Sequence, residues 1–303
     1  MPDMTSEKIN CLVYENKDEF IRRCEDAYKK QLDRISSDIC RNNGRVLVML
    51  AGPSSSGKTT TADILKRDFI KNGRHCIVVS LDDFYRDQEE SFYFEDGTID
   101  YETVKSIDTD YVAVCMENLI HEGKAMMPKF SFQTKRRESY AEVTVHDDEI
   151  IIVEGLHALN PVITDPLEKE KMIKLYVSVS SRIYKDSDIL LTKRDIRFIR
   201  RLIRDYHFRN SSVDYTFYLW KGVRMGEDRY LFPYSERADI KIDSIHPYEA
   251  CVFKDIASEL LDHIGTDSIY YPTACELKEK LSQFVSLSEG DVPDDSLLKE
   301  FIG

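Results

Sequence analysis

Residues 52–59 read Gly-Pro-Ser-Ser-Ser-Gly-Lys-Thr, which matches the phosphate-loop pattern G-x-x-x-x-G-K-[ST]. An apolar, strand-like run precedes the loop and a helix-like stretch follows it, which is the context that this motif requires. Gly52 and Gly57 let the backbone N–H groups turn toward a phosphate, and the helix N-terminus adds partial positive charge. Lys58 would reach the β- and γ-phosphates, and the Thr59 hydroxyl would bind Mg²⁺. The predicted nucleoside triphosphate site therefore consists of Gly52, Ser54, Ser55, Ser56, Gly57, Lys58, Thr59 and Thr60.

Carboxylates follow two other strand-like runs. Glu154 lies at the end of the apolar run 149–155, and Asp82 and Asp83 follow the run 75–80. Strand C-termini face the ligand crevice in open α/β sheets, so these groups should lie beside the bound phosphates. Glu154 is therefore predicted to contact magnesium. Asp82 or Asp83 could take a proton from an attacking hydroxyl and contact the metal, although an Asp-Asp pair can also simply cap a helix.

A basic segment stands out in an acidic chain. Residues 182–209 contain nine Lys or Arg against four Asp, whereas residues 247–303 contain four Lys against twelve Asp or Glu. At about 100° per residue, one third of a helix would carry Arg194, Arg197, Arg200, Arg201 and Arg204. Because arginine suits bidentate phosphate contact, we predict a phosphate-gripping lid near residues 192–215 rather than a solvated basic face.

One short pattern favours a different protein class. Thr192-Lys193-Arg194-Asp195 fits the [NT]-K-x-D tetrad with which GTPases read guanine. The tetrad runs straight into the arginine-rich helix, where Thr192 or Asp195 could instead serve as the N-terminal cap. A GTP-binding regulator is therefore retained as an alternative.

Composition and charge argue against several classes of protein. The chain has 303 residues and a formal net charge of −13, which argues against broad nucleic-acid or anionic-membrane binding. No apolar run has the length of a membrane span, and the N-terminus lacks a signal-peptide pattern. The seven cysteines include no C-x-x-C pair, so we predict reduced thiols in a cytoplasmic protein.

The hydrophobic pattern predicts one α/β protein with helical additions. Buried strands are expected at 46–51, 75–80, 149–155, 174–179 and 238–243. Near-continuous apolar strands that alternate with helices indicate a parallel sheet covered on both faces. We divide the chain into a helical N-terminal extension (1–44), a core with the phosphate loop (45–246) and an acidic helical C-terminal extension (247–303).

Four ordered motifs together resemble the uridine kinase / phosphoribulokinase family, in particular the bacterial uridine-kinase-like proteins. They are the phosphate loop, Ser80-Leu81-Asp82-Asp83-Phe84-Tyr85-Arg86, Val153-Glu154-Gly155-Leu156-His157-Ala158-Leu159-Asn160, and Arg200-Arg201-Leu202-Ile203-Arg204-Asp205 with Arg209. The resemblance covers about residues 45–245. It implies a P-loop kinase fold that uses ATP and Mg²⁺ and acts on a small-molecule acceptor.

The resemblance also implies roles for particular residues. Asp82 matches the catalytic base, which prepares the 5′-hydroxyl of a ribonucleoside for attack on the γ-phosphate. The implied catalytic group is Asp82, Lys58 and Arg204, the implied metal ligands are Thr59, Asp82 and Glu154, and the implied ATP-phosphate contacts of the lid are Arg204 and Arg209. The implied acceptor contacts are Asp82, Tyr85, Asp100, Phe130, Phe132, Lys135 and Arg201, with Asp100 at the ribose hydroxyls.

The acceptor-recognition stretch departs from the family pattern. Family members usually have Tyr-Asp-Phe followed shortly by His, but this chain has Phe130-Ser131-Phe132 and then Lys135. Phe130 lacks a hydroxyl and Lys135 can only donate hydrogen bonds. A base-side arginine is replaced by Ser211. We predict an ATP-dependent uridine or cytidine kinase, with a kinase for a sugar phosphate or pantothenate as the alternative, and a homo-oligomer as the state that the resemblance suggests.

Overall fold

The computed structural model describes residues 4–87, 92, 93, 95, 97, 100, 102–131, 133–167 and 170–303. Its centre is a five-stranded parallel sheet with the order β10-β7-β2-β6-β3. The strands are β2 (Val46–Ala51), β3 (Cys76–Ser80), β6 (Ile150–Glu154), β7 (Met172–Ser178) and β10 (Ile240–Asp243). All five predicted strands are present, and the predicted α/β fold class is confirmed.

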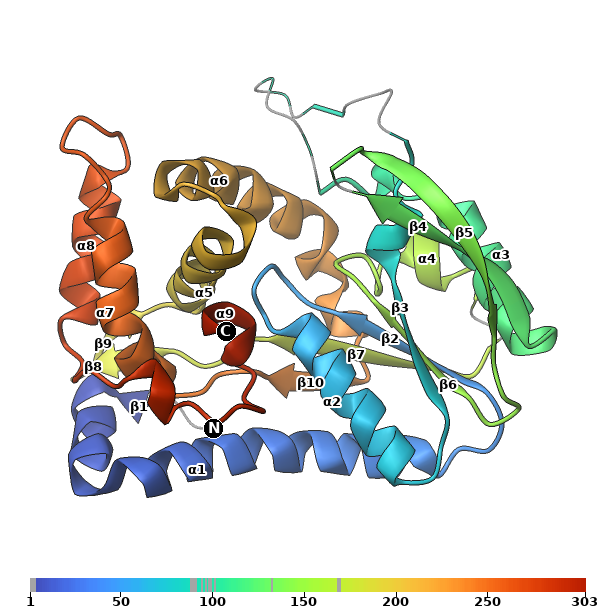
Figure 1. Ribbon diagram of the computed structural model, residues 1–303, viewed down its shortest axis with the longest axis horizontal. Coiled ribbons are helices and arrows are strands. Elements are labelled where there is room, and N and C mark those ends of the chain that lie inside the picture. The colour runs from blue at the N-terminus through green and yellow to red at the C-terminus, as the bar shows by residue number, and fades with distance from the viewer. Residues whose placement is uncertain are drawn as a thin grey trace.

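The sheet is buried on both faces because successive strand side chains point in opposite directions. Val48 and Leu50 of β2 join one hydrophobic cluster, while Leu47 and Met49 join the other. Helices of the first cluster are α1 (Ser6–Cys40), α2 (Lys58–Lys71), α5 (Lys193–Arg209), α6 (Val213–Tyr230), α7 (Glu249–Leu261), α8 (Tyr271–Leu281) and α9 (Lys299–Ile302). The second cluster includes α3 (Thr109–His121) and α4 (Pro161–Thr164), seen at the right of Figure 1. Of the helices in the described ranges, none is both long enough and apolar enough to cross a membrane.

Two smaller sheets were not expected from the sequence. An antiparallel hairpin joins β4 (Lys124–Ser131) to β5 (Arg136–Thr144), and β8 (Ile183–Lys185) pairs with β1 (Met4–Thr5) and β9 (Asp188–Leu191). Strand β5 is largely solvent-exposed, so it lacks the apolar alternation that marks a strand in sequence. Short 3₁₀ turns complete the fold: η1 (Leu81–Phe84), η2 (Val104–Ser106), η3 (Phe232–Arg237) and η4 (Glu289–Asp291).

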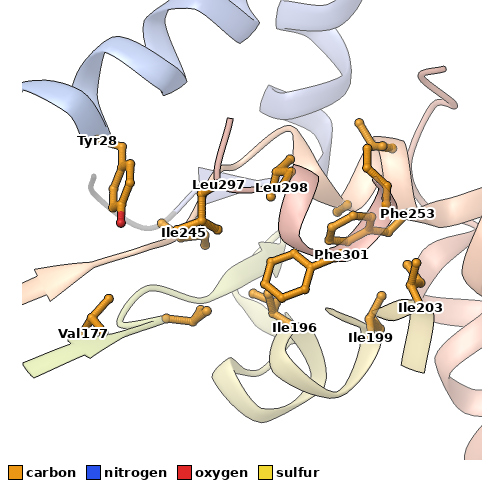
Figure 2. Packing of buried hydrophobic residues seen from close by; sticks show 14 of the residues in the cluster. Tyr28, Val177, Ile196, Ile199, Ile203, Ile245, Phe253, Leu297, Leu298 and Phe301 are labelled. Atoms are coloured by element: carbon orange, nitrogen blue, oxygen red, sulfur yellow. The ribbon is translucent and has the colours of Figure 1, made fainter. Parts of the chain in front are cut away.

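Both ends of the chain are built into the main core. Helix α1 has one break, at Asn16, where φ is −166° and ψ is 92°. Its buried side chains share a cluster with α7, α8 and α9, and Figure 1 shows α9 close to the phosphate-loop side of the sheet. Figure 2 shows Phe301 among Phe253, Ile196 and Ile199. Both terminal segments therefore form helices, and their side chains are part of the main core.

Candidate active site

The phosphate loop connects β2 to α2, and its two glycines are required for different reasons. Gly57 is the N-cap of α2 and has a left-handed φ of +86°. A Cβ atom at this position would lie 2.5 Å from Cδ1 of Leu297, so both backbone conformation and space favour glycine. Gly52 passes so close to the backbone oxygen of Val177 that a Cβ would overlap it. The loop is thus fixed between β7 and the C-terminal segment.

Several polar groups of the loop are oriented for an anion. The buried hydroxyls of Ser55 and Ser56 have no hydrogen-bond partner among the described residues. Buried polar atoms normally have partners, so these two fit the oxygens of a bound phosphate. The ammonium of Lys58 donates to the carbonyl of Pro53 at 3.2 Å, which places its charge over the loop.

Two buried ion pairs lie behind the loop. Arg197 of α5 pairs with Glu227 of α6 through Nη1 and Oε1 at 2.6 Å. Arg200 of α5 pairs with Glu249 of α7 through Nε and Oε2 at the same distance. All four side chains are at most 3% exposed. Each pair is also bidentate, because a second guanidinium nitrogen contacts the other carboxylate oxygen.

These pairs hold the phosphate loop from below. Glu227 accepts a hydrogen bond from the Ser54 backbone N–H at 2.8 Å, while Arg197 donates to the Ser54 carbonyl at 3.1 Å. Arg200 donates to the carbonyl of Ser55 at 3.4 Å. The predicted row of five phosphate-gripping arginines is therefore wrong for Arg197 and Arg200, because acidic partners from α6 and α7 draw both into the core.

Three arginines at the C-terminal end of α5 gather around one buried carboxylate, that of Asp205, whereas Arg194 near the start of the helix pairs with Asp228. Arg204 donates to Oδ1 of Asp205 at 2.7 and 2.9 Å, and Arg201 lies 3.1 Å from Oδ2. Arg209, more than half exposed, has its Nε 3.5 Å from Oδ1. Arg201 also donates to the Ser54 hydroxyl at 2.8 Å, so the cluster reaches the phosphate loop. This arrangement keeps three positive charges together at the C-terminal end of α5.

Two carboxylates face the loop from the ends of neighbouring strands. The Ser80 hydroxyl donates to Glu154 at 2.8 Å and accepts the backbone N–H of Asp82 at 3.3 Å, and so links β6 to η1. Burial raises the pKa of Asp82, with the Lys58 charge opposing that shift. Burial likewise raises the pKa of Glu154, again against the charge of Lys58. Asp82 nevertheless keeps exposed surface, so a substrate can reach its carboxylate.

Asp83 has a structural role instead. Its carboxylate pairs with the Lys129 ammonium at 3.1 Å and accepts the backbone N–H of Phe130 at 3.4 Å. The adjacent carboxylates therefore differ in their contacts: Asp83 links the β4–β5 hairpin to η1, whereas Asp82 stays the predicted base.

The hairpin and the segment around η1 carry several of the predicted acceptor contacts and would form one wall of that site. The rings of Tyr85 and Phe130 are 5.6 Å apart. Asp100 is buried, with Oδ2 accepting the Tyr230 hydroxyl at 2.6 Å. Burial and then the Asp82 charge raise the pKa of Tyr85 well above its usual value. Tyr85, Asp100 and Asp82 are thus close enough to influence one another.

Lys135 also belongs to the hairpin. It occupies the exposed turn of the hairpin with a left-handed φ of +57°. The predicted contact Phe132 lies outside the described residues.

Glu102 is a neighbour of this wall that the sequence reasoning missed. Burial raises its pKa from 4.5 to about 7, with Glu227 the next contribution in the same direction and Arg201 opposing it. Its backbone N–H donates to Oδ1 of Asp100 at 3.2 Å. A lone glutamate in an irregular segment carries no signal in the sequence, so only the fold brings it to the site.

Comparisons with known proteins show the family of this chain. A family-wide sequence profile described as "Phosphoribulokinase / Uridine kinase family" matches residues 47–249. The chain belongs to this family. A uridine kinase of Clostridium tetani is 29% identical over 198 residues, which cover 65% of this chain and 86% of that protein. A uridine kinase of Brevibacillus brevis is 30% identical over 200 residues, covering 65% and 84%.

A solved structure supports the fold of this family member. The putative fructose transport system kinase of Silicibacter sp. TM1040 aligns with a TM-score of 0.50 and 19% identity, covering 69% of this chain and 98% of that one. The helices that follow residue 249 extend beyond the region that the family profile matches.

The donor atoms of this kinase-family site fit magnesium held together with a nucleotide. Thr59, Glu154 and Asp82 offer hydroxyl and carboxylate oxygens, the hard ligands that Mg²⁺ prefers. Within the described ranges, no group of three His, Cys, Asp or Glu forms a metal site by itself. Mg²⁺ keeps several waters and shares phosphate oxygens in such sites, so a small set of protein ligands is what a nucleotide-borne ion needs.

The tetrad that favoured a GTPase has a local explanation. Thr192 is the N-cap of α5: its hydroxyl accepts the backbone N–H of Asp195 at 3.1 Å, and Asp195 accepts the backbone N–H of Thr192 at 3.0 Å. Asp195 also pairs with Lys280. The carboxylate that would read guanine is therefore used in a reciprocal capping box.

Proposed function

We propose that the protein transfers the γ-phosphate of ATP, in the presence of Mg²⁺, to the 5′-hydroxyl of a ribonucleoside such as uridine or cytidine. The observation that carries this proposal is the placement of Asp82. Its accessible carboxylate follows β3 at the carboxyl edge of the sheet, where burial raises its pKa and the charges of Lys58 and Arg209 oppose that rise. A base, a phosphate ligand and a neutralising cation are the groups that phosphoryl transfer needs.

The residues would divide the chemistry as follows. Asp82 accepts the proton of the acceptor hydroxyl while the hydroxyl oxygen forms a bond to the γ-phosphorus of ATP. The bond between the γ-phosphorus and the β–γ bridging oxygen breaks, and ADP leaves. Lys58 and the arginines held by Asp205 oppose the negative charge on the transferred group. Thr59 and Glu154 would hold Mg²⁺, which when bound neutralises charge on the β- and γ-phosphate oxygens. Because burial raises the pKa of Asp82, the base should lose activity on the acid side at a higher pH than an ordinary aspartate would.

A second acceptor class is supported by the hairpin. Phe130 packs its ring against Tyr85 and brings no hydroxyl to the site, and Lys135 sits on an exposed turn. Both features weaken the case for hydrogen-bonded recognition of a pyrimidine base, so another small hydroxyl compound, such as a sugar phosphate or pantothenate, is the alternative. A GTP-binding regulator ranks below it, because Asp195 is occupied by its capping role.

The test is ATP consumption with Mg²⁺ against a panel of nucleosides, sugar phosphates and pantothenate. Uridine or cytidine should give the highest kcat/KM. Asp82→Asn should lower kcat by about 100-fold or more, the usual contribution of a general base, with MgATP affinity within about threefold of wild type. Asp83→Asn is the matched control, because it makes the same chemical change at a residue that holds the hairpin. It should therefore change the KM for the acceptor.

The possible outcomes distinguish the proposed nucleoside kinase from the two alternatives. Turnover only with another hydroxyl compound would keep the mechanism and reject the nucleoside. If Asp82→Asn abolished ATP binding as well, Asp82 would be structural and the assignment of the base would be wrong. Tighter binding of GTP than ATP, without turnover of any acceptor, would favour the regulator.

A further inference from the structure

The C-terminal segment Ser296–Gly303 lies directly on the phosphate loop. Thr60, in the first turn of α2, donates its hydroxyl to Oε2 of Glu300 at 2.6 Å. Earlier in the C-terminal segment, the side chain of Leu297 covers Gly57, which is the N-cap of α2. Glu300 lies 240 positions beyond Thr60 and outside residues 47–249, which the family profile matches.

The segment is firmly anchored, so this contact is a built feature of the fold. Leu297, Leu298 and Phe301 are fully buried, and Figure 2 shows them packed into the main core. The Arg200 guanidinium carbon lies 5.2 Å from the centre of the Phe301 ring. The Ser296 hydroxyl donates to Glu25 of α1 at 2.6 Å. Glu300 is therefore held at the helix by the residues on both sides of it.

The electrostatics of this position point to the nucleotide. The first turn of a helix has unpaired N–H groups and partial positive charge, which attract an anion. Here the turn reads Lys58-Thr59-Thr60-Thr61 and has no carboxylate of its own. The Glu300 carboxylate supplies a negative charge from elsewhere in the chain. After burial and the charge of Asp82, the Glu300 charge is a further contribution that raises the pKa of Glu154, the predicted magnesium contact.

We infer that Glu300 is a residue of the nucleotide site that sets the affinity for the nucleotide: it holds the Thr60 hydroxyl, and its charge opposes the phosphates that bind at the same helix end. This inference rests on the proposed ATP site. The occupant that it concerns is the phosphate chain and not the base, because Coulomb repulsion acts on charge alone. The C-terminal segment would thus act as an internal counter-anion of the phosphate loop.

The experiment measures MgATP binding by calorimetry in wild type and Glu300→Gln. The amide oxygen of glutamine can still accept the Thr60 hydroxyl, so the substitution removes charge and keeps the contact. MgATP should bind about fivefold to tenfold more tightly, the scale of one partly screened charge, and the gain should shrink at high salt. Adenosine, which carries no phosphate, should bind equally to both proteins.

Two further variants separate charge from structure. Asp294→Asn removes an exposed carboxylate just before the C-terminal segment. The MgATP affinity of this variant should stay within about twofold of wild type, because solvent screens the charge of Asp294. Glu300→Asp keeps the charge but shortens the side chain that reaches Thr60. Its affinity should stay close to that of wild type, since the charge and not the hydrogen bond is inferred to matter.

Each outcome decides the inference. Unchanged or weaker MgATP binding in Glu300→Gln would overturn it, as would an equal gain for adenosine. An absence of MgATP binding in both proteins would overturn the inference together with the ATP site, whereas binding gained only by Glu300→Gln would support it. The measurement requires no acceptor, so a tighter Glu300→Gln protein that phosphorylates no nucleoside would refute the proposed acceptor and leave the inference standing.

Discussion

Replacing Arg200 by methionine tests whether the buried ion pairs carry the phosphate loop. Arg200 has no exposed surface, and its guanidinium donates to both oxygens of Glu249, to the hydroxyl and carbonyl of Ser244, and to the carbonyl of Ser55. Arg200→Met would leave the Glu249 carboxylate charged and without its partner in the core. Breaking a buried pair in this way costs about 3–5 kcal/mol of unfolding free energy.

The double variant Arg200→Met/Glu249→Leu provides the sharper test. Removing both charges removes the main penalty, so the free energy of unfolding should recover to within about 1–2 kcal/mol of wild type. The remaining loss comes from the carbonyl of Ser55 and the backbone N–H of His246, which lose the hydrogen bonds made to Arg200 and Glu249. Equilibrium urea unfolding, followed by circular dichroism, measures each difference.

A control on the same helix sets the scale. Arg194 pairs with Asp228 at the surface, where the two side chains are 39% and 52% exposed. Exposed pairs contribute little, so Arg194→Met should cost less than about 1 kcal/mol. A loss of similar size for Arg200→Met, or a double variant no more stable than the single one, would refute the reasoning.

Two predictions concern the site itself. Asp205→Asn removes the charge that gathers Arg201, Arg204 and Arg209. MgATP should therefore bind about tenfold more weakly, while the affinity for adenosine is retained. An MgATP affinity within about twofold of wild type would show that the arginine cluster does not lie at the phosphates. Burial raises the pKa of Glu102 from 4.5 to about 7, so the folded state holds its proton more tightly and stability should fall as pH rises through this interval. Melting temperatures at pH 5 and 7.5 should therefore differ less in Glu102→Gln than in wild type, and an equal difference in both would contradict the shifted pKa.

Much of the fold can be read from the sequence because its signals are local. The strands over 46–51 and 149–155 are continuous apolar runs, and such runs identify buried parallel strands without any knowledge of their neighbours. The phosphate loop is a contiguous motif whose glycines are required by the backbone itself. The hairpin β4–β5 lacked such a signal, because most side chains of β5 face solvent and their pattern resembles that of a polar loop.

The phosphate loop, the strands of the parallel sheet and the carboxylates at their ends can be recognised from the sequence alone, since each depends on residues within a few positions of one another. The partners of the charged groups depend instead on how distant segments pack. Arg197 and Arg200 read as a phosphate-binding face until α6 and α7 bring Glu227 and Glu249 against them. Glu300 reaches Thr60 from 240 positions away. The sequence shows which residues are charged, but long-range packing decides whether each charge contacts solvent, a ligand or an opposite charge. The physical reason is that a charged side chain can be buried at low cost only where a partner of opposite charge is brought against it.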